Sequence, residues 1–264
     1  MPTIGAYLKP TSVQEAYALM ISSENSAIIG GGFFMRFSSK KIGTAIDLTE
    51  ANLDFITETD DTVEIGAMTT ADQLQRNAIL QKRFDGLIPA SVSHLPGLQM
   101  RNMVTVGGTV SGKYGFSELI TGLLALESYI KLYQGGLKRI DEFLTAKGKL
   151  CDIVEKVIIK KRNLRCSYQV FRNSSGSLPI LTVAVSRSGN DYRIAVGARP
   201  AVASLAVEAM RFLLENEISE ANIAESAEIA GAELEFSSDR RASGDYRREL
   251  CKVLVRRAVM EVKP

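Results

Sequence analysis

Residues 101–126 read RNMVTVGGTVSGKYGFSELITGLLAL, and this stretch joins two patterns that seldom occur together. Residues 104–106 predict a short β-strand that ends at the glycine pair Gly107-Gly108. Glycines at a strand end let backbone amides approach a ligand that a Cβ atom would keep away, and such amides bind phosphate or flavin oxygens. The stretch therefore predicts a ligand-binding loop, with an apolar segment that begins after the acidic residue Glu118.

A second glycine cluster, Gly30-Gly31-Gly32, follows an apolar run at residues 27–29, about 75 residues earlier in the chain. Two glycine-terminated strands predict one ligand held between two lobes. A Cβ atom at Gly31 or Gly108 is expected to enter the space of that ligand. The alternative is that the triplet only turns the end of a strand, and the presence of the second glycine loop favours the ligand site.

Composition indicates an ordinary globular protein of more than one sub-domain. The chain has 264 residues, of which 45% are hydrophobic and 23% are charged. The net charge of +2 and the absence of a long basic block argue against a nucleic-acid partner. No apolar run approaches the ~18 residues of a membrane span, and the N-terminus does not resemble a secretory signal. We therefore expect a cytoplasmic protein with no membrane partner.

Cysteine and histidine usage excludes several kinds of site. Cys151, Cys166 and Cys251 are scattered without a CxxC pair, and three thiols cannot supply the four ligands of an ordinary iron–sulfur cluster. His94 is the only histidine, which argues against a multi-histidine metal site and against a Ser–His–Asp triad. The sequence predicts no catalytic residue and no metal ligand, so the chemistry is expected to belong to a cofactor.

Periodicity and capping signals predict an α+β chain. The first part contains a βαβ-like unit with a capping box at residues 12–15, and a second capping box at residues 70–73. Strands are predicted at 27–30, 44–48, 54–58, 62–67, 104–106, 128–133 and 153–159, and a helix at 88–95. The last hundred residues predict three strands, at 167–171, 180–186 and 192–196, and helices at 200–216, 219–229 and 244–262. This pattern of strands followed by helices is typical of an α+β domain.

Several of these motifs, in this order and spacing, identify a family. Arg101-Asn102, residues 105–108 (TVGG) and residues 123–126 (LLAL) resemble the FAD-binding medium subunit of the molybdenum hydroxylases, which include xanthine dehydrogenase and aerobic carbon monoxide dehydrogenase. Residues 65–70 (IGAMTT) are similar to the family's IGAxTT segment, and residues 246–258 to its C-terminal helix. Each motif is weak alone, and their shared order makes the resemblance strong.

The resemblance implies a two-lobed FAD-binding domain of the PCMH type (vanillyl-alcohol-oxidase-like) at residues 1–162, with lobes at about 1–52 and 53–162. A C-terminal domain at residues 163–264, with a three-stranded antiparallel sheet and helices, would follow. The implied FAD contacts are Gly30, Gly31, Gly32, Phe33, Phe34, Met35 and Arg36, then Thr70, Leu95 and Arg101, then Thr105, Val106, Gly107, Gly108 and Thr109, and finally Glu118 and Arg172. For Arg101, pairing with a carboxylate is an equally open alternative.

By this resemblance the chain is an oxidoreductase subunit that is not catalytically complete alone. It would pass electrons from the [2Fe-2S] clusters of a small subunit through FAD to an external acceptor, NAD or another, while a molybdopterin-binding large subunit hydroxylates the substrate. Two alternatives stay open: a degenerate scaffold or assembly subunit without tightly bound flavin, and a stand-alone flavin reductase.

The sequence departs from the family at several positions. Phe33-Phe34 stand where relatives often have Thr and Asp, Thr109 replaces Asn, and Glu118 replaces Asp.

Overall fold

The computed structural model describes residues 1–148 and 150–264, and they form two compact units. The first unit comprises Met1–Leu74, Gly97–Gly112 and Tyr129–Ile159. The second comprises Gln75–Pro96, Lys113–Ser128 and Lys160–Pro264. Each unit is therefore built from segments that are distant in the sequence. The division expected at residue 162 remains a prediction.

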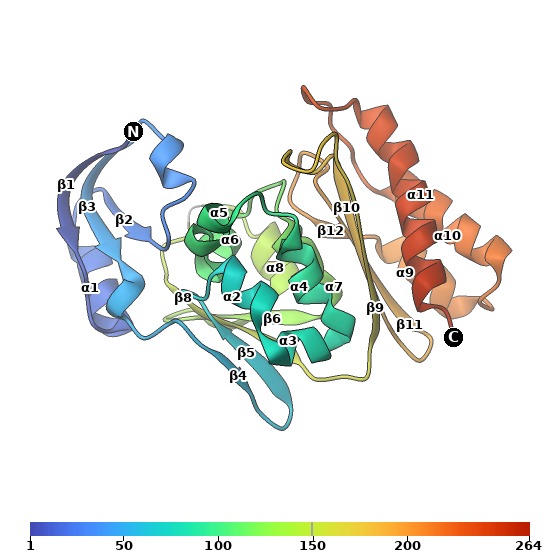
Figure 1. Cartoon of the computed structure of the whole chain (residues 1–264), viewed down its shortest axis with the longest axis horizontal. Helices are drawn as coiled ribbons and strands as arrows, with labels where there is room; N and C mark the ends of the chain where they lie inside the picture. The colour runs from blue at the N-terminus through green and yellow to red at the C-terminus, as the bar shows by residue number, and fades with distance from the viewer. Residues whose placement is uncertain (149) are drawn as a thin grey trace. The chain divides into compact units, whose positions relative to one another are not determined.

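The first unit contains a three-stranded parallel sheet near the N-terminus, drawn in blue in Figure 1. Its strands are β1 (Thr3–Leu8), β2 (Ser26–Ile29) and β3 (Lys41–Asp47), in the order β1-β3-β2, and α1 (Val13–Ser22) lies between β1 and β2 in the chain. The Ser12 side chain caps α1 by accepting a hydrogen bond from the Glu15 amide, as the capping box predicts. Ile29 pairs with Asp47, so the first glycine loop begins where these two strands end.

A five-stranded sheet completes the strands of this unit, in the order β4-β5-β8-β6-β7. The predicted hairpin is present as β4 (Ile56–Glu58) and β5 (Thr62–Gly66), which pair antiparallel. The other strands are β6 (Ser128–Leu132), β7 (Gly136–Arg139) and β8 (Val154–Lys160). The other helical segments here are η1 (Met35–Phe37), η2 (Leu48–Glu50), α5 (Leu98–Met103), α6 (Val106–Gly112) and α8 (Ile140–Thr145), and α2 (Ala71–Arg76) begins in this unit.

The predicted strand at residues 104–106 is wrong. Only Thr105 pairs, in a single antiparallel bridge with Thr70, and Val106 already begins helix α6. The Val106 amide donates to the Thr69 carbonyl, and the Thr109 amide donates to the Thr105 carbonyl, which closes a helical turn. The β-branched residues 104–106 favour a strand locally. Thr70 is the one residue that pairs with them, in a single bridge, so the surrounding fold overrides their strand propensity.

The second unit is built on an antiparallel sheet with the order β12-β11-β10-β9. The three predicted strands are present as β9 (Arg165–Phe171), β10 (Leu181–Ser188) and β11 (Asp191–Gly197). A fourth strand, β12 (Ser204–Leu205), pairs with β11, so the expectation of a three-stranded sheet is corrected to four. The helix predicted at 200–216 begins only at Val207, because the preceding residues continue the sheet edge and the Ala206 amide donates to the Ile194 carbonyl.

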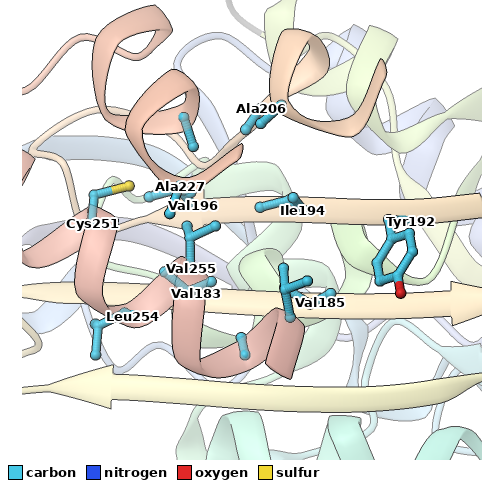
Figure 2. Packing of buried hydrophobic residues seen from close by; sticks show 14 of the residues in the cluster. Val183, Val185, Tyr192, Ile194, Val196, Ala206, Ala227, Cys251, Leu254 and Val255 are labelled. Carbon is cyan, nitrogen blue, oxygen red and sulfur yellow. The ribbon is translucent and has the colours of Figure 1, made fainter. Parts of the chain in front are cut away.

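Strand β10 is buried on both faces. Leu181, Val183 and Val185 point into a core shared with α9 (Val207–Glu215), α10 (Glu220–Glu233) and α11 (Gly244–Val262). Figure 2 shows Val183 beside Val255 of α11. Successive strand residues point to opposite faces, so Thr182 and Ser186 face the other side. There they bond Thr121 and the Ala125 carbonyl of α7 (Glu118–Ala125).

Helix α11 has the bounds predicted from its periodicity. Among its apolar residues, Leu254 and Ala258 are buried, while Val253 is exposed. Arg247 is buried and donates hydrogen bonds to the carbonyls of Ile180 and Ala198. The remaining helical segments are α3 (Ala78–Lys82), η3 (Phe84–Gly86) and α4 (Leu87–Ser93). No helix in the described part of the chain has the length and apolar character that a membrane crossing needs.

Candidate functional site

The two glycine loops meet inside the first unit. A Cβ atom at Gly31 would overlap the carbonyl oxygen of Met103, and one at Gly30 would overlap the hydroxyl of Thr105. A Cβ atom at Gly107 would lie 2.7 Å from the Cβ of Ala67. These three glycines are needed because protein atoms fill the adjacent space. The expectation that a side chain at Gly31 would enter ligand space is therefore wrong.

Two other glycines of the loops are less enclosed by protein atoms. Gly32 has φ +70°, a left-handed conformation that favours glycine, and the nearest atom to its ideal Cβ is Ile29 Cγ2 at 3.8 Å. Gly108 is exposed in the first turn of α6, and apart from its own helix backbone its ideal Cβ has one neighbour within 4 Å, Thr105 Oγ1, at a tight 3.0 Å. These less enclosed glycine surfaces fit a group that approaches the backbone closely.

The amides of the second glycine loop already have protein acceptors. The acceptors are Thr69 O for Val106 (3.0 Å), Ala67 O for Gly107 (2.7 Å), Thr105 Oγ1 for Gly108 (3.2 Å) and Thr105 O for Thr109 (2.9 Å). The amides of the second loop are therefore not free to donate hydrogen bonds to a ligand, and they can contribute only van der Waals contacts. In the first loop the amides of Gly31, Gly32 and Phe33 donate to no other residue that the structure describes. The first loop is the better anion cradle of the two.

The residues after the first glycine triplet form a short 3₁₀ turn, η1 (Met35–Phe37). Phe33 and Phe34 meet edge to face, with ring centroids 5.1 Å apart. Both rings are half-buried, and Arg36 is exposed. The predicted contacts Phe33, Phe34, Met35 and Arg36 thus lie together beside the first loop.

Thr70 and Arg101 are engaged by neighbouring side chains. The Thr70 amide donates to Gln73 Oε1 (2.7 Å), and the Gln73 amide donates to Thr70 Oγ1 (3.3 Å), which is the predicted capping box. Arg101 Nε lies 3.6 Å from Asp72 Oδ1, and both side chains are largely buried. Arg101 therefore has the carboxylate partner that was one of its two possibilities, and its contact with the cofactor stays a prediction.

Glu118 and Arg172, both predicted as cofactor contacts, form a buried ion pair in the second unit. Arg172 Nη2 lies 2.6 Å from Glu118 Oε2, and the two side chains are 9% and 3% exposed. Arg172 Nη1 also donates to the carbonyls of Ser177 (2.8 Å) and His94 (3.5 Å). The pair thereby links the first residue of α7 to the turn that contains Leu95.

Tyr168 belongs to the same group and was missed from the sequence. Its hydroxyl donates to Glu118 Oε2 at 3.1 Å, and burial, together with the negative charge of Glu118, raises the pKa of this tyrosine well above 10.0. Tyr168 pairs with Ala184 of β10, which puts it on the sheet face that packs against α7. The alternation of side chains along β9 could have placed Tyr168 on that face of the sheet, but it could not have shown that Tyr168 lies beside Glu118.

The predicted site residues thus fall into two groups, one in each unit. The glycine loops, Thr70 and Arg101 belong to the first unit, and Leu95, Glu118 and Arg172 belong to the second.

Comparison with protein families covers both parts of the chain. A family described as "FAD binding domain in molybdopterin dehydrogenase" matches residues 3–161. A second, described as "CO dehydrogenase flavoprotein C-terminal domain", matches residues 166–262.

Full-length relatives and solved structures agree with these matches. The chain is 29% identical to the nicotine 6-hydroxylase medium subunit of Paenarthrobacter nicotinovorans, covering 97% of this chain and 96% of the relative. It is 24% identical to the glyceraldehyde dehydrogenase medium chain of Sulfolobus acidocaldarius, covering 97% and 98%.

Two solved structures share the fold. They are a carbon monoxide dehydrogenase chain from Hydrogenophaga pseudoflava (TM-score 0.89, 24% identity, coverage 99% and 98%) and a quinoline 2-oxidoreductase chain from Pseudomonas putida 86 (TM-score 0.88, 22% identity, coverage 99% and 97%).

The family's cofactor is FAD, and the first unit fits it: two glycine surfaces are less enclosed by protein atoms, and three loop amides are not used by described residues. The homologous chains are oxidoreductase subunits of larger enzyme complexes. The chain belongs to the family of FAD-binding medium subunits of the molybdenum hydroxylases.

Proposed function

We propose that this chain is the FAD-binding electron-transfer subunit of a molybdenum hydroxylase complex. The proposal rests on one observation: two glycine loops, about 75 residues apart in the sequence, contact each other within the family's FAD-binding domain. The pyrophosphate would accept hydrogen bonds from the amides of Gly31, Gly32 and Phe33, since anions favour such clustered donors. Gly32 and Gly108 would border the cofactor with bare backbone.

Bound FAD would carry electrons from iron–sulfur clusters to an external acceptor. The role of the chain's own residues is to bind and orient this group. Cys151, Cys166 and Cys251 are too few for a four-ligand cluster, so the clusters must lie on a partner. The proposed partners are a [2Fe-2S] small subunit and a molybdopterin-binding large subunit, with NAD or another molecule as acceptor and the cytoplasm as location.

The resemblance also assigns cofactor contacts to Leu95, Glu118 and Arg172, and these stay predictions. Tyr168 and Arg172 both donate to Glu118 Oε2. A buried carboxylate with two such donors is held in one orientation. In this proposal Glu118 therefore presents a carboxylate of fixed orientation to the cofactor.

The test is to isolate the tagged chain from its native cells and to measure flavin, iron and molybdenum in the eluate. The proposal predicts that all three elute with the chain. Flavin without iron or molybdenum would instead support a stand-alone flavin reductase. Iron and molybdenum without flavin would support a scaffold subunit, and either result would contradict the proposal.

A further inference from the structure

An aromatic cluster with one cation follows the first glycine loop directly. It consists of Phe33, Phe34, Arg36 and Phe37, and we call it the aromatic cluster. The Arg36 amide donates to the Gly32 carbonyl (3.3 Å), and the Phe37 amide donates to the Phe34 carbonyl (3.2 Å). The glycine loop and the aromatic cluster are thus one continuous, hydrogen-bonded turn.

The side chains of the cluster hold one another in place. Phe33 meets Phe37 edge to face, with centroids 5.7 Å apart and an interplanar angle of 77°. The Arg36 guanidinium carbon lies 4.3 Å from the Phe33 centroid and 4.7 Å from the Phe37 centroid. Such cation–π contacts orient both the ring and the guanidinium group. In the described part of the chain no carboxylate pairs with Arg36, so its charge is available to an anionic or π-rich ligand.

Phe37 is nevertheless 69% exposed. A single exposed phenylalanine is common on protein surfaces and needs no explanation by itself. This ring differs because it is oriented by Phe33 and Arg36 and because it lies on the turn that begins at the proposed phosphate loop. A fixed, solvent-facing aromatic ring beside a guanidinium group is a surface on which a nucleobase can stack.

We propose that the adenine ring of FAD stacks on Phe37, with Arg36 beside it, and that this contact makes the site select adenine-containing flavin over FMN. The inference rests on the proposed FAD site, because it takes the pyrophosphate to lie on Gly31, Gly32 and Phe33. The adenosine end of the cofactor then needs a surface near that loop, and the aromatic cluster is the next element along the chain. Stacking on an aromatic side chain contributes about tenfold or more in affinity per base.

The test measures the dissociation constants of FAD, ADP and FMN for the whole chain and for three variants. Phe37→Ala removes the ring, and Phe37→Tyr retains a stacking ring. Phe171→Ala is the matched control, since Phe171 is also exposed (38%) and lies in the second unit. Phe37→Ala should weaken FAD and ADP binding about tenfold and leave FMN binding unchanged. Phe37→Tyr and Phe171→Ala should bind all three probes as the parent chain does.

Two results would overturn the inference. Equal weakening of FAD, ADP and FMN by Phe37→Ala would mean that the ring only supports the glycine loop. Unchanged FAD and ADP binding would mean that the exposed ring serves another purpose, such as covering by a partner subunit. Failure of the parent chain to bind FAD would defeat the proposed function, and the ADP measurements would still decide whether Phe37 contacts adenine.

Discussion

The carbonyl oxygen of Met103 occupies the space that a side chain at Gly31 would need. The two residues are 72 positions apart, and their contact fixes one glycine loop against the other. Glycine at position 31 is thus required by the packing of the protein itself, whereas Gly108 is exposed and its ideal Cβ approaches only a side-chain hydroxyl, that of Thr105. The two glycines should therefore respond differently to the same substitution.

Gly31→Ala should destabilise the chain even without FAD, because the new methyl group overlaps a backbone atom that cannot rotate away. The expected loss is about 2 kcal/mol, in the range of overpacking effects. Thermal melting of the flavin-free protein provides the measurement. An unchanged melting temperature would show that the loops do not pack as described.

Gly108→Ala is the matched substitution at the exposed glycine. Alanine favours a helix by up to about 1 kcal/mol over glycine, which offsets the tight contact of its methyl group with the Thr105 hydroxyl, so the flavin-free protein should lose far less stability than Gly31→Ala. FAD affinity should fall, because the methyl group extends into the proposed cofactor space. Isothermal titration with FAD gives the affinity, and an affinity equal to that of the parent chain would remove Gly108 from the site.

Glu118→Gln should cost about 3 kcal/mol of folding stability, because it leaves the buried Arg172 without its counter-charge. The control is Asp245→Asn, which breaks the ion pair with Arg248, where the two side chains are 93% and 41% exposed. Exposed pairs contribute about 0–1 kcal/mol. Urea denaturation gives the free energy of unfolding of both variants. An equal loss in the two variants would contradict a buried role for Glu118.

Tyr168→Phe should cost about 1.5 kcal/mol, since it removes a hydrogen bond to a buried carboxylate. In a Glu118→Gln background the same change should cost less, because the charged acceptor is gone. The double-mutant cycle isolates this coupling. Strictly additive losses would show that the hydroxyl does not act through Glu118.

Asp47 should make stability depend on pH in the acid range. Burial raises the pKa of this carboxyl group, but hydrogen bonds from Thr49 and Tyr7 outweigh burial and hold it below 3.8. A pKa lowered by folding stabilises the protein above the unfolded value, and this contribution is lost as pH falls through the folded value. Asp47→Asn should therefore lose less stability than the parent chain between about pH 5 and pH 3. Parallel stability curves would refute this role.

The fold was predictable where the signal is local and periodic. The capping boxes at Ser12 and Thr70 and the bounds of α11 followed from spacing along the chain. Short elements were not predictable in this way. Helix α6 and strand β12 depend on partners elsewhere in the fold: the Val106 amide donates to the Thr69 carbonyl, and Ser204 and Leu205 pair with β11.

In the candidate site, too, sequence motifs predicted some residues, whereas long-range contacts decide the others. The order of the glycine motifs pointed to both loops, and the structure brings them together. The pairing of Glu118 with Arg172 joins residues 54 positions apart, and no pattern in the sequence links them. Tyr168 was missed for the same reason, since its role depends on the register between β9 and β10.

The proposed function requires that the chain itself binds FAD, and titration of the purified, flavin-free chain with FAD measures this binding. We expect saturable binding of one FAD per chain, with flavin absorption that remains with the protein after gel filtration. A folded chain, verified by cooperative thermal unfolding, that shows no saturable FAD binding would contradict it.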